Sequence, residues 1–346
     1  MRERLEYAAT WALLKILGAL PRRVARWSAA GLALFLFQLR PAWRRVALFN
    51  LRLAFPEWPE ARCRVVVRKM VRNLGWMAAE FARFPKYTRE NIAQTIVLEE
   101  FENFAAAERR GKGVLFLTGH MGAWELMPFA HALYDEPLYF LVRTIDNARV
   151  NALVEQYRGI SGNRPIQKNQ SARPVLRILS QGGTIGILAD QNTAIEEAVF
   201  ADFFGVPAAT SSGIARLARR TGAAVVPAYG YWDASAGKYR LHYEREIELE
   251  ATDDEQSDIQ RYTARFNQII ENYVRRFPDQ WLWVHRRWRN RPPGEKPIYP
   301  DETPHERPDE RPDEMADETP DETAGGTPDE MPDGMKRRGS KKGEAR

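Results

Sequence analysis

A histidine and a glutamate five residues apart are the first residues in this sequence whose types and spacing suggest chemistry. His120 directly follows an apolar run that ends in a Thr-Gly pair, and Glu125 comes after a short turn of small residues. Two residues five apart on a regular helix point about 140° apart. The pair can therefore meet only if His120 lies on a loop after a strand and Glu125 lies in the first turns of the following helix. In that arrangement a carboxylate can orient an imidazole that acts as general base.

Polar residues also follow two other apolar runs. Arg143 comes directly after one run, and its forked guanidinium suits a phosphate or a carboxylate, or a surface ion pair with Asp146. Asp190 and Gln191 follow the next run. Asp190 could orient Arg143, hold a substrate amide or hydroxyl, or cap the next segment. Because strand ends carry the chemistry of α/β folds, we expect these residues to converge with His120.

Short apolar runs alternate with helical stretches from about residue 96 onward. This rhythm predicts an α/β fold with a central mixed sheet flanked by helices. The pattern from residue 262 to residue 276 predicts an amphipathic helix, followed by a segment rich in tryptophan and arginine. The predicted strands are residues 114–117, 138–142, 184–188 and 224–228.

Several classes of site are not indicated by the sequence. Cys63 is the one cysteine, so no intramolecular disulfide can form and a reducing compartment is favoured. No second histidine or cysteine stands at ligand spacing from His120, so we expect no metal. Neither the phosphate-binding loop pattern nor the dinucleotide-binding pattern occurs, so ATP and NAD are not implied, and we expect no cofactor.

The formal charge of +5 conceals two parts of opposite sign. Residues 301–346 carry 15 acidic and 8 basic side chains, and residues 1–300 carry 31 acidic and 43 basic side chains. A body with a net charge of +12 favours anionic partners. Nucleic acid, anionic lipid and an acidic carrier protein all fit this charge.

The N-terminal part contains two apolar runs, residues 8–20 and 28–39, with Trp11, Trp27 and Trp43 and basic residues beside them. Each run is shorter than the ~20 residues that a spanning helix needs. The pattern favours helices that lie in or dip into an anionic membrane surface. Ordinary core helices or a single N-terminal span are the alternatives.

The composition divides the chain into three parts. We predict a membrane-associated helical anchor over residues 1–45 and an α/β domain over residues 46–299. Residues 300–346 repeat Pro-Asp-Glu units and have almost no apolar side chains. Such a segment cannot form a core, so we predict a disordered acidic tail.

Taken together, the motifs resemble one family over roughly residues 5–295: the bacterial lipid A biosynthesis acyltransferases of the lauroyl/myristoyl type, within the lysophospholipid acyltransferase superfamily. The His-x4-Glu spacing alone would be weak, but the order and spacing of all the motifs are specific. The motifs that carry the resemblance are Gly119 to Glu125, Val142-Arg143-x3-Asn147, Ala189-Asp190-Gln191, Phe203 to Ala208, Val226-Pro227 and Trp281-x-Trp283-x-His285-Arg286-Arg287.

The resemblance implies an enzyme on the cytoplasmic side of the inner membrane. It would move a fatty acyl chain from acyl carrier protein to a hydroxyl of a lipid A precursor, a Kdo-modified glycolipid like lipid IVA. It implies that His120 is the general base and Glu125 its orienting partner, and that Arg143 holds phosphate or the developing oxyanion. The other residues carried over to the substrate site are Asn147, Asp190 and Gln191.

Two alternatives stay open. The acceptor could be another glycolipid or a lysophospholipid. The chain could also be a non-catalytic basic protein that binds a membrane or nucleic acid through the tryptophan- and arginine-rich residues 281–289, although that function leaves the polar strand ends unexplained. We expect no nucleic acid partner, and the sequence does not indicate an oligomeric state.

Overall fold

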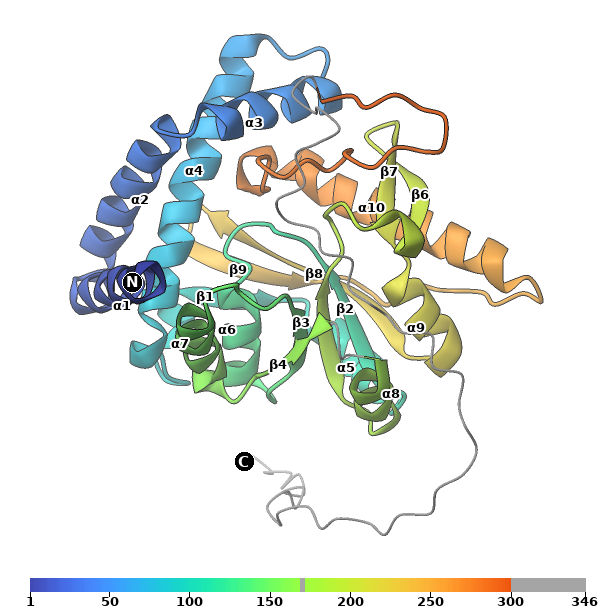
Figure 1. Ribbon diagram of the computed structural model, residues 1–346. Helices are drawn as coiled ribbons and strands as arrows, with labels where there is room; N and C mark the ends of the chain where they lie inside the picture. The colour runs from blue at the N-terminus through green and yellow to red at the C-terminus, as the bar shows by residue number, and fades with distance from the viewer. Residues whose placement is uncertain (169–171, 300–346) are drawn as a thin grey trace, which may run out of the picture. The chain divides into compact units, whose positions relative to one another are not determined.

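A seven-stranded sheet lies at the centre of the computed structural model, which describes residues 1–168 and 172–299 (Figure 1). Its strands are β1 (Ile96–Glu99), β2 (Val114–Thr118), β3 (Tyr139–Val142), β4 (Arg164–Gln167), β5 (Thr184–Leu188), β8 (Ala224–Asp233) and β9 (Lys238–Tyr243). Their order is β1-β9-β8-β2-β5-β3-β4. Only β8 and β9 pair antiparallel within this sheet, so the predicted mixed sheet flanked by helices is confirmed.

The four predicted strands are all present in this sheet. The bounds of β5 match the prediction, those of β2 and β3 differ by one residue, and β8 is five residues longer than predicted. The sequence analysis did not predict β1, β4 and β9. It also missed a separate antiparallel hairpin of β6 (Ala198–Phe203) and β7 (Val206–Ser211). The predicted tail, residues 300–346, lies outside the described residues.

Helices cover both faces of the sheet, because successive side chains of a strand point to opposite faces. Leu115 and Leu117 of β2 pack in one core with α8 (Ala172–Ser180), α9 (Gly213–Thr221) and α10 (Glu255–Arg276). Phe116 points to the other face and packs in a second core. The helices of that second core include α5 (Phe101–Glu108), α6 (Leu126–Tyr134) and α7 (Ala148–Arg158).

The N-terminal part is helical, as its apolar runs predict. It forms α1 (Arg2–Ala19), α2 (Arg22–Gln38), α3 (Pro41–Ala54) and α4 (Glu60–Ala82). Within the described residues, no helix combines the length and the apolar character that crossing a membrane requires. The division predicted between residues 45 and 46 falls inside α3 and stays a prediction.

A buried carboxylate ties α2 to α4. Glu80 on α4 is fully buried, and Arg22 on α2 donates to it over 2.9 Å. The guanidinium of Arg26 lies between the rings of Trp76 and Trp232, 3.9 Å from each ring centroid. A desolvated cation between two aromatic faces is a favourable contact. These contacts fix α2 against α4 and against β8 of the sheet.

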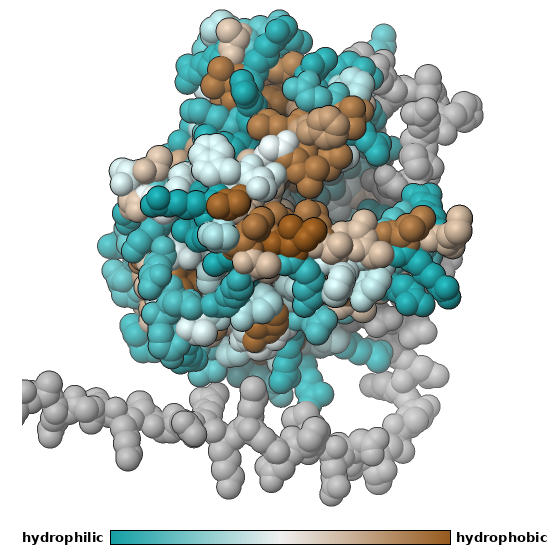
Figure 2. Space-filling model, turned by 90° about the vertical axis from the view of Figure 1, so that its left-hand side faces the viewer, coloured by the Kyte–Doolittle hydropathy of each residue, from teal (hydrophilic) through white to brown (hydrophobic). Residues whose placement is uncertain are grey.

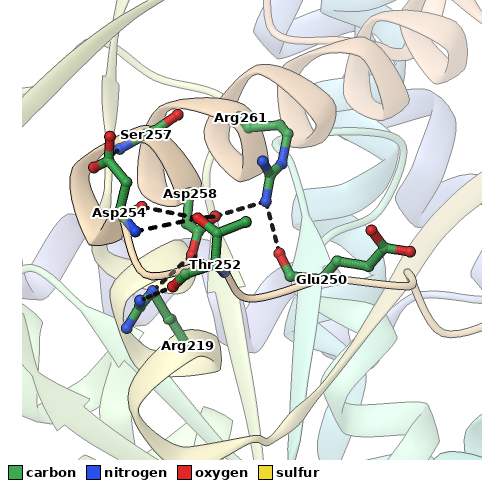
Figure 3. Close-up of polar contacts among 7 residues, drawn as sticks. All are labelled: Arg219, Glu250, Thr252, Asp254, Ser257, Asp258 and Arg261. Carbon is green, nitrogen blue, oxygen red and sulfur yellow. Dashed lines mark hydrogen bonds and ion pairs between the residues drawn. The ribbon is translucent and has the colours of Figure 1, made fainter.

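A second buried carboxylate, Asp258, holds the start of α10 (Figure 3). It accepts hydrogen bonds from the backbone and hydroxyl of Thr252 and from Arg219 of α9, and it pairs with Arg261. Burial alone would raise the pKa of Asp258, but these hydrogen bonds and the charge of Arg261 outweigh burial and lower the pKa to about 2. Asp258 therefore joins α9, α10 and the preceding loop as an ionised group.

Replacing Asp258 tests this junction. We expect Asp258→Asn to lower the thermal unfolding midpoint by several degrees, because Arg219 loses its charged partner. Since the pKa is lower in the folded chain than the usual 3.8, the difference from wild type should be full above pH 4 and shrink as the pH falls toward 2. The control is Asp253→Asn, an exposed carboxylate in the same loop. Equal midpoints for both variants at pH 7 would contradict the assignment.

Candidate active site

His120 lies on the loop between β2 and α6, and two backbone hydrogen bonds hold this loop against a distant segment. The carbonyl of His120 accepts a hydrogen bond from the backbone N–H of Leu282 over 3.1 Å, and Gly122 N–H donates to the carbonyl of Gln280 over 2.7 Å. Gly122 adopts a φ of 56°, in the left-handed region that favours glycine. The loop is therefore fixed by the segment that follows α10, more than 150 residues away in the sequence.

Asp190, at the end of β5, is the carboxylate that orients His120. Its Oδ1 lies 2.8 Å from His120 Nδ1, and its Oδ2 accepts from His120 N over 2.8 Å and from Trp281 Nε1 over 2.7 Å. Burial alone would raise the pKa of Asp190, but its interactions with His120 and Trp281 lower it to about 2. A side-chain carbon at Gly119 would lie 3.0 Å from Asp190 Cγ, so glycine gives the carboxylate its space.

This geometry sets the tautomer of His120. Because an ionised carboxylate can only accept, Nδ1 of His120 carries the proton and Nε2 is left as the basic nitrogen. The side chain is 19% exposed, and its ring meets Trp124 edge to face with centroids 5.2 Å apart. Gln191 Nε2 lies 3.4 Å from His120 Nε2. The Gln191 amide is then the donor and His120 Nε2 the acceptor, so a hydroxyl that gives its proton to Nε2 would take the place of this amide.

Glu125 was expected to orient His120, but its carboxylate bonds to Arg158 and not to the histidine. It stands at the N-cap of α6, where its carboxylate forms a two-pronged ion pair with Arg158 of α7 over 2.9 and 2.5 Å. The loop from His120 to Glu125 directs the two side chains to different partners. Asp190, and not Glu125, is therefore the carboxylate that is bonded to His120 and orients its ring.

An apolar pocket begins beside His120, on the sheet face below α6. The empty space between its walls is about 660 Å³, a volume that includes open solvent. The Glu125–Arg158 pair and Trp124 form part of its wall. Its apolar lining comes from five neighbouring strands and α6, and includes Phe116, Phe140, Leu188, Ala228, Leu241 and Met127.

The other two predicted residues lie on the segment after β3. Arg143 is exposed at the carboxyl end of that strand. Asn147 is buried and caps α7, with its amide oxygen accepting from the N–H groups of Arg149 and Val150 and its amide nitrogen donating to Glu3 and Glu6 of α1. Those four bonds use its hydrogen-bonding capacity. Asn147 thus ties α1 to α7, and its contact with substrate stays a prediction.

The tryptophan- and arginine-rich segment after α10 is buried and supports the site, because Trp281 donates to Asp190. Trp281, Trp283, Trp288 and Arg287 are at most 1% exposed. Rings buried in this way cannot stack on the bases of a nucleic acid, so the nucleic-acid alternative loses the feature that suggested it. The hydrogen bond from Trp281 to Asp190 was not predicted; the density of aromatic residues in this segment was the available signal.

A neighbouring histidine, His285, belongs to the framework of the site. Burial lowers the pKa of His285 to about 4, so it is neutral at physiological pH. Its Nε2 accepts a hydrogen bond from the backbone N–H of Asn192 over 2.9 Å. Asn50 of α3 donates to the carbonyls of Trp283 and His285 over 2.8 Å each. These bonds fix the loop that carries Asp190.

Comparisons with known proteins identify the family of the chain. Residues 2–290 match the family described as bacterial lipid A biosynthesis acyltransferase. The lipid A biosynthesis palmitoleoyltransferase of Escherichia coli K12 is 28% identical over 75% of this chain and 84% of its own length. The myristoyltransferase of the same organism is 26% identical over 78% of this chain and 84% of its own length.

A third relative and one solved structure extend the comparison. The lipid A biosynthesis lauroyltransferase of Escherichia coli K12 is 25% identical over 83% of this chain and 94% of its own length. The 1-acyl-sn-glycerophosphate acyltransferase of Thermotoga maritima covers 74% of this chain and 98% of its own at 12% identity, with a TM-score of 0.36, too distant for a comparison of sites. The match to the family spans most of the chain. The chain belongs to the bacterial lipid A biosynthesis acyltransferases and is an acyltransferase.

Proposed function

We propose that this acyltransferase moves a fatty acyl chain from acyl carrier protein to a hydroxyl of a lipid A precursor at the inner membrane, with His120 as general base. One observation carries the proposal. A partly exposed histidine is held by a buried, ionised carboxylate, that of Asp190, beside an apolar pocket. An oriented base and a place for a hydrocarbon chain are what acyl transfer to an alcohol requires.

The chemistry follows from the tautomer of His120. The acceptor hydroxyl gives its proton to Nε2 while its oxygen attacks the carbonyl carbon of the acyl thioester. The carbon–sulfur bond then breaks, and the imidazolium returns the proton to the departing sulfur. Asp190 stabilises the imidazolium that forms between these steps, because it is ionised and bonded to Nδ1.

The reaction also needs a positive group near the carbonyl oxygen of the thioester, because negative charge develops on that oxygen during the attack. We assign Arg143, exposed at the carboxyl end of β3, to an acceptor phosphate or to the oxyanion. The acyl chain occupies the pocket, whose walls are mostly apolar. The basic body of the chain favours approach of an acidic carrier protein and a phosphorylated lipid.

The N-terminal helices supply the surface that we assign to the membrane. Apolar side chains gather on the face of the molecule that α1 and α2 occupy (Figure 2). Large apolar side chains that are at least 40% exposed on α1 to α3 and their connections are Leu5, Trp11, Ile16, Val24, Trp27, Leu32, Phe35, Leu36, Leu39 and Trp43. Exposed basic residues, among them Lys15, Arg23 and Arg40, accompany them. Apolar and basic side chains together suit an anionic lipid surface.

Variants of the histidine and its partner test the base. We expect His120→Ala and Asp190→Asn each to lower kcat for acyl transfer by about 100-fold or more. In Asp190→Asn, the amide can donate to Nδ1, which favours the tautomer with a protonated Nε2. The measurement is transfer of a radiolabelled acyl chain from acyl carrier protein to lipid IVA carrying Kdo. The control is Asp202→Asn, because Asp202 is the exposed residue of β6. A normal kcat in Asp190→Asn together with a reduced kcat in Glu125→Gln would contradict the assignment and favour Glu125 as the partner of His120.

The membrane face is tested without reference to catalysis. We expect the double variant Phe35→Ser, Leu39→Ser to bind vesicles of phosphatidylglycerol and phosphatidylethanolamine at least about tenfold more weakly in co-sedimentation, because two exposed apolar anchors are lost. Val65→Ser on α4, where the valine is also exposed, is the matched control. Equal weakening by all the variants would argue against a specific face.

A glycine in the pocket wall tests where the acyl chain lies. A side-chain carbon at Gly186 would lie 3.7 Å from Phe140 Cβ and 3.9 Å from Leu138 Cδ1, and both neighbours line the pocket. We expect Gly186→Leu to shift donor preference about tenfold toward chains two carbons shorter, at ~0.8 kcal/mol per methylene. Gly186→Ala should have little effect, because its methyl makes an ordinary contact. An unchanged preference for acyl chain length in Gly186→Leu would show that the acyl chain does not bind in this pocket.

A further inference from the structure

The indole of Trp281 is the side-chain donor to Asp190 that does not come from His120. Asp190 Oδ2 accepts from Trp281 Nε1 over 2.7 Å and from the backbone N–H of His120 over 2.8 Å, while Oδ1 faces His120 Nδ1. An indole nitrogen can only donate. Among the described residues, those that line the pocket beside His120 do not include Trp281. A role for Trp281 in the reaction would therefore act through Asp190.

Packing and a backbone bridge hold the ring of Trp281 in place. The residue is 1% exposed. Its ring meets that of Trp283 edge to face with centroids 4.6 Å apart, and its centroid lies 5.6 Å from that of Phe203. The backbone of Trp281 forms an antiparallel bridge with Met121, the residue after His120. The same short segment therefore positions the loop that carries the base and a donor to the carboxylate that orients the base.

The indole helps to decide which way the carboxylate of Asp190 faces. The last bond of an aspartate side chain turns easily. Two donors on Oδ2 hold the group so that Oδ1 faces His120 Nδ1. Without the bond from Trp281, one donor would remain on Oδ2, and a buried charge would lose part of the hydrogen bonding that it requires.

The indole also withdraws negative charge from the side of Asp190 that faces the imidazole. Burial alone would raise the pKa of Asp190, but the interactions with His120 and Trp281 lower it to about 2. Hydrogen bonds to an ionised carboxylate stabilise its charge, and each donor competes with the others for that charge. Loss of the indole donor would therefore strengthen the hold of Asp190 on a protonated His120.

The other titratable groups near Asp190 come from the segment after α10. Burial lowers the pKa of Arg287 to about 10, and the charge of Asp190 acts in the opposite direction. Arg287 donates to groups of β7. Burial lowers the pKa of His285 to about 4, and Asp190, Arg287, His120 and Arg289 contribute through their charges. These groups stay in place when Trp281 is changed.

We propose that Trp281 is a positioning residue for the reaction, whose indole N–H fixes the carboxylate of Asp190 toward His120 and limits how strongly that carboxylate holds the protonated ring. This inference rests on the proposed function, because it takes His120 as the general base.

Removing the N–H while keeping the ring shape tests the proposal. Trp281 is replaced by benzothienylalanine, in which sulfur stands in place of the N–H, and Trp281→Phe is the second variant. In acyl transfer from acyl carrier protein to lipid IVA carrying Kdo, the acidic midpoint of the pH profile of kcat/KM should rise by about one unit in both. We expect kcat on the plateau to fall about tenfold, the effect of one hydrogen bond to a charged group. KM should stay unchanged, because Trp281 does not line the pocket.

Trp288→Phe is the matched control. Trp288 is fully buried, its ring lies 5.9 Å from that of Phe203 between centroids, and its indole N–H donates to the carbonyl of Phe203 over 3.2 Å. The control therefore loses a buried indole from the same aromatic cluster but no bond to Asp190. It should lower the thermal unfolding midpoint as Trp281→Phe does and leave the pH profile at its wild-type position.

The outcomes separate this inference from the function on which it rests. A wild-type pH profile in the benzothienylalanine variant overturns the inference, and so does an equal rise of the midpoint in Trp288→Phe. If the wild-type chain transfers no acyl group, the proposed function fails, and the ring of His120 is then titrated directly by NMR of isotopically labelled histidine, with His120→Ala identifying its signal. The titration midpoint must be about one pH unit higher in the benzothienylalanine variant, and an unchanged midpoint overturns the inference.

Discussion

The buried charge of Asp190 is the constraint on which the site depends. A carboxylate that is 1% exposed can stay ionised only if hydrogen-bond donors surround it. Three donors do so, the backbone and ring of His120 and the indole of Trp281. They come from the loop after β2 and from the segment after α10. Removing one partner of such a buried group typically costs about 3–5 kcal/mol, so stability and orientation of the base depend on the same bonds.

The same constraint explains why the N-terminal helices belong to the catalytic unit. The segment around Trp281 and Trp283 is not regular secondary structure, so its backbone groups need partners from elsewhere. Asn50 on α3 donates to the carbonyl of Trp283, and Asn73 on α4 donates to that of Asp279 over 2.9 Å. α3 and α4 are therefore in hydrogen-bond contact with the segment that completes the site. Truncating these two helices would remove partners of that segment.

The sequence predicted which strand ends carry the polar residues but not how those residues pair. Apolar runs bounded by polar residues identify β2, β3, β5 and β8 because parallel central strands are buried on both faces. His120 and Asp190 do converge, 70 residues apart. Glu125 is the nearer carboxylate in sequence, but proximity along the chain does not decide pairing once a loop turns the two side chains apart. Its partner, Arg158, is the last residue of α7, and no local pattern links the two.

Other differences have similar physical causes. β9 alternates half-buried and buried residues from Lys238 to Tyr243, and its basic residues take the half-buried positions, a pattern that strand periodicity could have identified. Asn147 followed a strand end, as substrate-binding residues do, yet it is used as a helix cap, for which asparagine is equally suited. The type and position of a residue limit its possible roles. Which role it takes depends on whether its side chain already forms its hydrogen bonds within the protein, as that of Asn147 does.

The spacing of His120 and Glu125 gains a different meaning from these contacts. Four residues separate His120, which faces Asp190, from Glu125, which faces Arg158 in the pocket wall. In the proposed function, one short motif serves both halves of an acyl transfer, the activation of a hydroxyl and the shaping of a chain site. Both side chains leave the same loop, so the distance between His120 and the pocket is set by the backbone. This coupling requires the strand to end just before His120, and β2 ends with Thr118, which lines the pocket.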